Sequence, residues 1–93
     1  MAVEASKIAS NLHIDSDPDE LDVINSLIVT AKALVKSSVD ADMSDEAYEA
    51  YPLFDSAVEA LVTAMYYDRT LQNGMPKAVT IMVTHLQARI GGI

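Results

Sequence analysis

The residues of this chain whose types and spacing could bind a metal lie close together, around position 15. Asp15, Asp17 and Asp19 alternate along the chain as the first ligands of an EF-hand calcium loop do. Such a loop also needs a glycine at its sixth position and a bidentate glutamate at its twelfth, and this chain has Glu20 and Ser26 there. The calcium-loop pattern is therefore incomplete, and we predict no metal site.

The same acidic segment has the residue order with which a helix begins. Asp17 can cap a helix by accepting a hydrogen bond from a free backbone N–H, and Pro18 has no N–H to leave unpaired. Glu20 occupies the third helical position, where a glutamate completes a variant of the capping box. Helix capping is therefore our preferred interpretation of this segment.

The remaining polar residues match no known catalytic pattern. His13 and His85 are the only histidines, and neither has a second histidine three or four residues away. The chain has no cysteine, no glycine-rich phosphate loop and no Gly-x-Ser-x-Gly turn. Asp15-Ser16 is similar to the phosphopantetheine site of acyl carrier proteins, although Asp17 replaces the leucine expected after the serine. We predict that the protein is not an enzyme and has no catalytic residue and no cofactor.

Tyrosine and arginine are enriched at the energetic centres of protein–protein interfaces, and two short segments of this chain contain one or both of them. Tyr66, Tyr67 and Arg69 form one segment, and Gln87 and Arg89 lie together in the other. We predict that these five residues are interface residues and that the arginines pair with the acidic surface of a neighbouring copy. Alternatively, the tyrosines complete a small core and the arginines stabilise the negative ends of their own helices.

Apolar residues recur at helical spacing along most of the chain, and each of the three prolines stands where a helix should begin. The expected central core helix carries the stripe Leu21, Ile24, Ile28, Ala31 and Val35. Asn73-Gly74 is expected to end the helix that begins at Pro52. We predict an all-α bundle of four to five helices, over about residues 3–12, 18–37, 44–51 (short), 52–73 and 76–90.

The length and composition favour one small domain, residues 1–93, that works with a partner. A chain this short buries a smaller fraction of its surface than larger domains do. Its hydrophobic fraction of 51% nevertheless is high, so either the core is rich or some apolar surface is reserved for a partner. The chain starts without the basic and apolar segments of a signal peptide, and no stretch reaches the ~18 apolar residues of a membrane span. We therefore expect no membrane partner.

The net charge of −8 is distributed unevenly along the chain. All 14 acidic residues lie within residues 1–68 with three lysines, which gives −11, whereas residues 69–93 hold three cations and no acid. The negative excess argues against binding to nucleic-acid phosphates. The polarity favours head-to-tail contacts between copies of the chain.

Together these features resemble the head–tail connector proteins of tailed bacteriophages, also described as phage DNA-packaging proteins. The family begins with a short helix and the pattern L-x-I-D-x-D-x-D-D-x-L-L-x-x-L-I-x-x-A. The matching segment here is Leu12-His13-Ile14-Asp15-Ser16-Asp17-Pro18-Asp19-Glu20-Leu21, followed by Leu27-Ile28 and Ala31. Before Pro76, Tyr66-Tyr67-Asp68-Arg69 matches the family's Y-x-N-R element. After Pro76, Gln87-Ala88-Arg89-Ile90-Gly91 corresponds to the family's terminal Q-L-R-G. The resemblance spans about Val3 to Gly91, and Ala88 and Ile90 depart from the terminal pattern.

The resemblance implies a homo-oligomeric ring of about twelve copies, built from heterologous contacts that close on themselves. Such a ring docks below the phage portal protein, extends the DNA channel and links the capsid to the downstream neck or tail protein. DNA would pass through the channel without sequence-specific binding. The expected location is the head–tail junction of the virion, and the host cytoplasm during assembly.

Two hypotheses from other classes remain open. An acidic inhibitor or regulator would occupy a basic site on a nucleic-acid enzyme and compete with DNA for it. A carrier protein would bear a pantetheine adduct on Ser16, which an intact mass would show.

Overall fold

The computed structural model describes residues 4–12, 17–68, 71 and 74–90, and it confirms the all-α fold. It contains α1 (Ala5–Asn11), α2 (Pro18–Val39), α3 (Asp45–Tyr48), α4 (Pro52–Tyr67) and α5 (Lys77–Ile90). No strand occurs in the described ranges. Within them, no helix is both long enough and apolar enough to cross a membrane.

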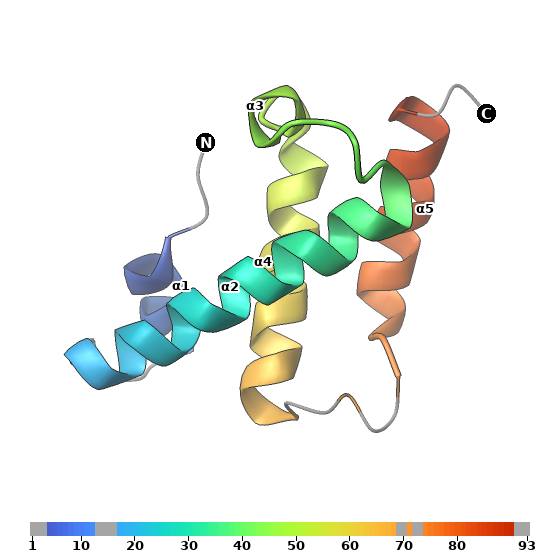
Figure 1. The fold of residues 1–93 in the computed structure, drawn as a ribbon. Helices are drawn as coiled ribbons and strands as arrows, with labels where there is room; N and C mark the ends of the chain where they lie inside the picture. Colours follow the sequence, from blue (N-terminus) through green and yellow to red (C-terminus); the bar gives the residue numbers. More distant parts are fainter. Residues whose placement is uncertain (1–3, 13–16, 69–70, 72–73, 91–93) are drawn as a thin grey trace.

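The helices form a small bundle that is organised by α2. Helices α4 and α5 lie side by side in opposite directions, and α2 crosses both of them (Figure 1). Helix α1 packs against the first half of α2, and α3 lies at the start of α4 (Figure 1). With 22 residues, α2 is about 33 Å long, and the longest dimension of the molecule is 42 Å. One helix therefore holds the other large elements together.

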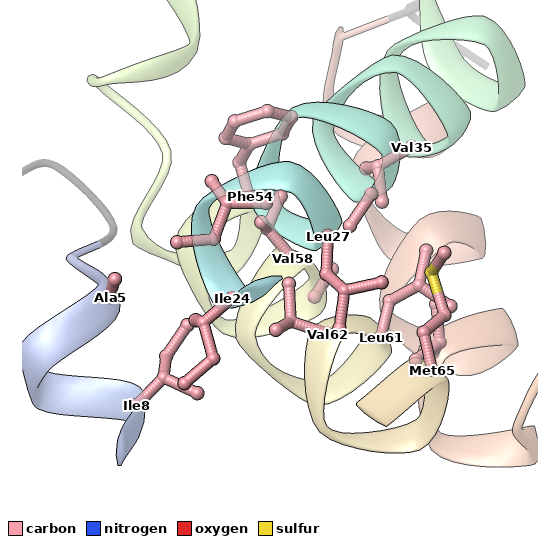
Figure 2. Packing of buried hydrophobic residues seen from close by; sticks show 14 of the residues in the cluster. Ala5, Ile8, Ile24, Leu27, Val35, Phe54, Val58, Leu61, Val62 and Met65 are labelled. Carbon is pink, nitrogen blue, oxygen red and sulfur yellow. The ribbon is translucent and has the colours of Figure 1, made fainter. Parts of the chain in front are cut away.

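The core lies where the buried face of α2 meets α4. Ile24 and Val35 of α2 and Leu61 of α4 are fully buried, and their neighbours along both helices interdigitate (Figure 2). The buried residues of α2 are Ile24, Leu27, Ile28, Ala31 and Val35, which confirms the predicted central stripe except for Leu21, which is half-buried. Their spacing of three and four residues places these side chains on one face of α2. Burial of this face in the core stabilises the helical conformation of the whole segment.

The start of α2 follows from its sequence alone. The Asp17 carboxylate accepts a hydrogen bond from the Glu20 N–H at 2.9 Å, and Pro18 is the first helical residue, as predicted. The helix continues two residues beyond the predicted boundary, through Val39, whose half-buried side chain packs against the core.

Helix α4 ends at Tyr67, six residues before the predicted boundary at residue 73. Leu71 has a φ of 49° and Gly74 a φ of 82°, and the N–H groups of these two residues donate to Asp68 and Leu71 carbonyls. The half-buried Leu71 side chain packs against the core. Burial of this side chain offsets a left-handed backbone conformation that costs a residue other than glycine roughly 1–2 kcal/mol.

Candidate interface surfaces

Tyr66, one of the predicted interface residues, already has a hydrogen-bond partner within the subunit. Its hydroxyl donates to the Glu20 Oε2 at 2.8 Å, and this hydrogen bond joins the end of α4 to the start of α2. The Glu20 carboxylate, expected to complete a capping box, thus has a tertiary partner. Tyr67 is 70% exposed, and its ring meets the Tyr66 ring edge-on at 5.4 Å between centroids. Tyr67 remains available to a partner.

Of the two predicted residues near the end of α5, Gln87 has a hydrogen-bond partner within the subunit, whereas Arg89 has no ion-pair partner among the described residues. The Gln87 side-chain amide donates to the Ser38 carbonyl at 2.6 Å. Ser38 lies in the last turn of α2, where carbonyls have no partner within the helix, so Gln87 satisfies one of them. Arg89 is exposed and has no ion-pair partner in the described part of the chain. Arg69, the fifth predicted residue, lies outside the described residues.

The predicted anchors do not lie on one patch. Tyr66 and Tyr67 lie at the end of α4, and Gln87 and Arg89 lie near the end of α5. Because these helices are antiparallel, the two pairs are at opposite ends of the molecule (Figure 1). The two pairs therefore lie on separate parts of the surface.

An open pocket of about 400 Å³ lies beside Arg89. Apart from Arg89 it is lined by the segment that leads into α4 and by one buried leucine of α5, namely Ala50, Tyr51, Pro52, Leu53 and Leu86. Among the described residues that line this hollow, Arg89 has the only charged side chain.

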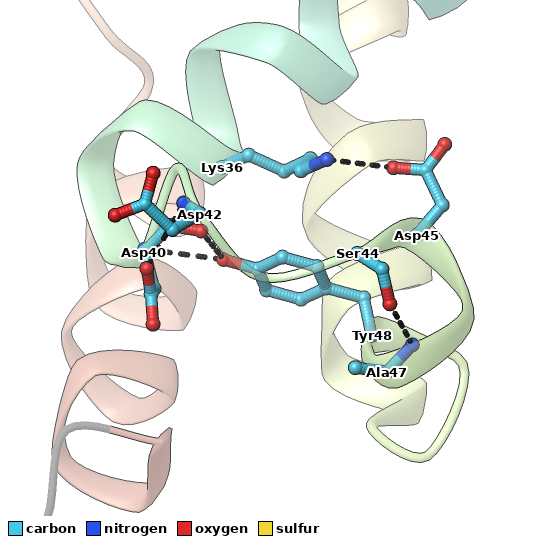
Figure 3. Close-up of polar contacts among 7 residues, drawn as sticks. All are labelled: Lys36, Asp40, Asp42, Ser44, Asp45, Ala47 and Tyr48. Carbon is cyan, nitrogen blue, oxygen red and sulfur yellow. Dashed lines mark hydrogen bonds and ion pairs between the residues drawn. The ribbon is translucent and has the colours of Figure 1, made fainter.

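The densest group of polar contacts joins the end of α2 to α3 (Figure 3). Lys36 pairs with Asp45 at 2.8 Å, the only ion pair between two described residues, and the Lys36 hydrogen bond holds the pKa of Asp45 below its usual value. The Tyr48 hydroxyl donates to the Asp40 carbonyl at 2.7 Å and accepts from the Asp40 N–H at 3.1 Å. Ser44 caps α3 through the Ala47 N–H. These contacts serve structure, because each stabilises a helix end or joins neighbouring segments of the chain.

No metal-binding cluster of three or more suitable side chains occurs among the residues described. The Asp15 of the calcium-like segment and the Ser16 of the carrier hypothesis lie outside them. His85 is exposed on α5.

Between Asp22 and Asp40 every fully exposed residue of α2 is uncharged. We call this side of the helix the α2 outer face and define it by seven exposed residues: Asn25, Ser26, Val29, Thr30, Ala33, Leu34 and Ser37. Val29 is 69% exposed, the most exposed aliphatic residue of substantial size. Lys32 and Lys36 are half-buried on the flank of this face, and Lys36 is already neutralised by Asp45.

The solvent side of α5 is uncharged from Ala78 to Ala88, between the exposed Lys77 that begins the helix and Arg89 near its end. We call it the α5 outer face and define it by five exposed residues: Ala78, Ile81, Thr84, His85 and Ala88. Ile81 is 49% exposed. The buried residues of α5 (Val79, Val83 and Leu86) turn toward α4 and α2, so the two outer faces lie on different sides of the molecule.

Neither face was among the predicted interface residues, although both leave a signal in the sequence. Residues 23–31 and 78–88 contain no Asp, Glu, Lys or Arg. An amphipathic helix at a protein surface usually carries its charged residues on the solvent side. The periodicity identified the buried stripes, but only the structure shows that the opposite sides are both exposed and uncharged.

No protein-family model matches the chain, and no curated protein or solved structure matches it either.

Proposed function

We propose that this protein is a structural subunit of a phage head–tail connector ring, which docks below the portal and extends the DNA channel. The observation that carries the proposal is the pair of uncharged outer faces, on α2 and α5, in a chain of net charge −8. The sequence resemblance to connector proteins names the kind of assembly.

Charge limits how copies of this chain can meet. Subunits of net charge −8 repel one another, so a stable contact must either exclude carboxylates or pair them with cations. The α2 and α5 outer faces are the long helical surfaces in the described residues that exclude carboxylates. Two different faces on different sides allow each subunit to contact two neighbours, as closure of a ring requires.

The acidic surface that remains suits a DNA channel. Exposed carboxylates lie at the start of α2 and around α3, at positions that include Asp19, Asp42, Glu46 and Glu49. Like charges repel at short range, so carboxylates facing a channel would keep DNA from adhering to its wall. Because the carboxylates repel the DNA phosphates, DNA would pass through the channel without sequence-specific binding.

Native mass spectrometry of the purified protein, alone and with a phage portal protein, tests the proposal. We expect a closed ring of about twelve copies in at least one of these samples. A strict monomer in both samples would overturn the proposal.

A pair of single variants tests whether the outer faces carry the assembly. Val29→Glu adds a charge to the α2 outer face and should abolish the ring. Ser6→Glu adds the same charge to an exposed position of α1 and should leave the ring intact. Equal effects of the two variants would show that net charge, and not the α2 face, decides assembly.

An acidic inhibitor of a nucleic-acid enzyme is the second candidate function. It is favoured by the exposed carboxylates around α3, on Asp42, Glu46 and Glu49, which could imitate a short run of phosphates. A monomer that competes with DNA for a basic enzyme would support this candidate over the connector.

A further inference from the structure

We propose that the α2 outer face of one copy docks on the α5 outer face of the next copy, with Arg89 against the acidic start of α2. This inference rests on the proposed function, because it supplies the contact from which the ring is built. The occupant of each face is therefore a second copy of this chain.

Charge complementarity supports this pairing. The uncharged face of α5 ends at Arg89, whose guanidinium has no ion-pair partner in the described residues. The uncharged face of α2 begins after Asp22, which lies on the same side of that helix as Ser26 and Val29. Joining the two faces pairs the cation of one copy with a carboxylate of the other and brings no two carboxylates together along their length.

Spacing favours an antiparallel arrangement of the two helices. Val29 lies seven residues after Asp22, and Ile81 lies eight residues before Arg89. At 1.5 Å per residue these separations are about 10 and 12 Å. Placing Asp22 opposite Arg89 in an antiparallel pair therefore brings Val29 and Ile81, the most exposed aliphatic residues of the two faces, into contact.

The positions of the two faces allow the contact to repeat. The start of α2 and the end of α5 lie at opposite ends of the molecule (Figure 1). Each copy can then offer its Arg89 end to one neighbour and its acidic end to the other.

Disulfide trapping tests this contact directly, because the natural chain has no cysteine. A disulfide requires Cβ atoms about 3.5–4.5 Å apart, so it reports close approach of the two positions. We expect that V29C mixed with I81C, oxidised with diamide, forms a crosslinked heterodimer. The V29C/I81C double variant should form a ladder of covalent oligomers on a non-reducing gel.

The control is Tyr67→Cys, an equally exposed position away from both faces, which should not crosslink with V29C. Crosslinking of V29C only with itself, or equal crosslinking of the control, would overturn the docking mode. Native mass spectrometry of the wild-type protein separates the two proposals. A closed ring without V29C–I81C crosslinks overturns this inference alone, whereas crosslinks without a closed ring overturn the connector function alone.

A charge swap tests the role of Arg89. Arg89→Glu should eliminate the crosslinked ladder of the V29C/I81C variant, and adding Asp22→Arg should restore it. Lys7→Glu is the matched control, since it makes the same change in charge at an exposed lysine of α1. Equal loss with Lys7→Glu, or no recovery in the swapped variant, would remove Arg89 from the contact.

Discussion

At the scale of single residues, Asp55 is the exception in an otherwise apolar core. It is 6% exposed and is the only charged residue that is buried among those described. Burial raises the pKa of its carboxyl, while the positive charges of Lys32 and Lys7 act in the opposite direction. Ionisation of Asp55 therefore costs folding free energy at neutral pH.

Replacing Asp55 with asparagine should show this cost as a dependence on pH. Because the folded-state pKa is raised above 3.8, the unfolded chain loses its proton first as the pH increases. The contribution of Asp55 to the stability of the wild-type protein therefore decreases as the pH rises from 3.8 to the folded-state pKa. Asp55→Asn should gain stability relative to wild type over this range. Urea unfolding from pH 3 to pH 7 measures the difference.

Asp19→Asn is the matched control, since Asp19 also lies in the first turn of a helix but is exposed. Its stability difference from wild type should lack the upward trend. A flat difference for Asp55→Asn would contradict a raised pKa at this position.

At the scale of elements, the four-residue α3 depends on tertiary contacts. A helix of this length is not stable alone. The Tyr48 ring is fully buried and stacks on Phe54 of α4 at 4.3 Å between centroids. Its hydroxyl bonds both backbone groups of Asp40, the residue that ends α2. One side chain thus fixes α3 against the ends of two larger helices.

Tyr48→Phe should keep the ring stacking and lose the two hydrogen bonds of the hydroxyl. The Asp40 backbone groups would then lack this partner in a partly buried place, which costs about 1–3 kcal/mol. Tyr67→Phe removes a hydroxyl from an exposed ring and should change stability by less than about 0.5 kcal/mol. The unfolding free energies of both variants in urea check the comparison, and equal values would contradict the structural role of Tyr48.

At the scale of the whole molecule, stability and assembly should be linked. A domain of 93 residues buries a limited core, and this one leaves two uncharged helix faces in solvent. Assembly that buries those faces stabilises the folded state by mass action. The thermal midpoint of the wild-type protein should therefore rise with protein concentration.

Differential scanning calorimetry over a hundredfold range of concentration measures this effect. The Val29→Glu variant provides the control, because its midpoint should stay constant if its monomer folds but does not assemble. A wild-type midpoint that is independent of concentration would show that the faces do not associate without another partner.

The sequence was sufficient wherever a feature depends on neighbours within one or two turns of helix. The Asp17 cap, the proline starts of α2 and α4, and the buried stripe of α2 are of this kind. Each follows from backbone groups and side chains three or four residues apart, so the pattern contains the necessary information. The all-α class follows from the same periodicity.

The tertiary structure alone decided the features that depend on distant partners. The end of α4 follows from the packing of Leu71 on the core, and Tyr66 and Gln87 bond residues 46 and 49 positions away. No local pattern specifies such distances, because they depend on how the helices cross. The same crossing places the predicted interface residues at opposite ends of the molecule. It also exposes the uncharged sides of α2 and α5, on which we propose that this protein assembles.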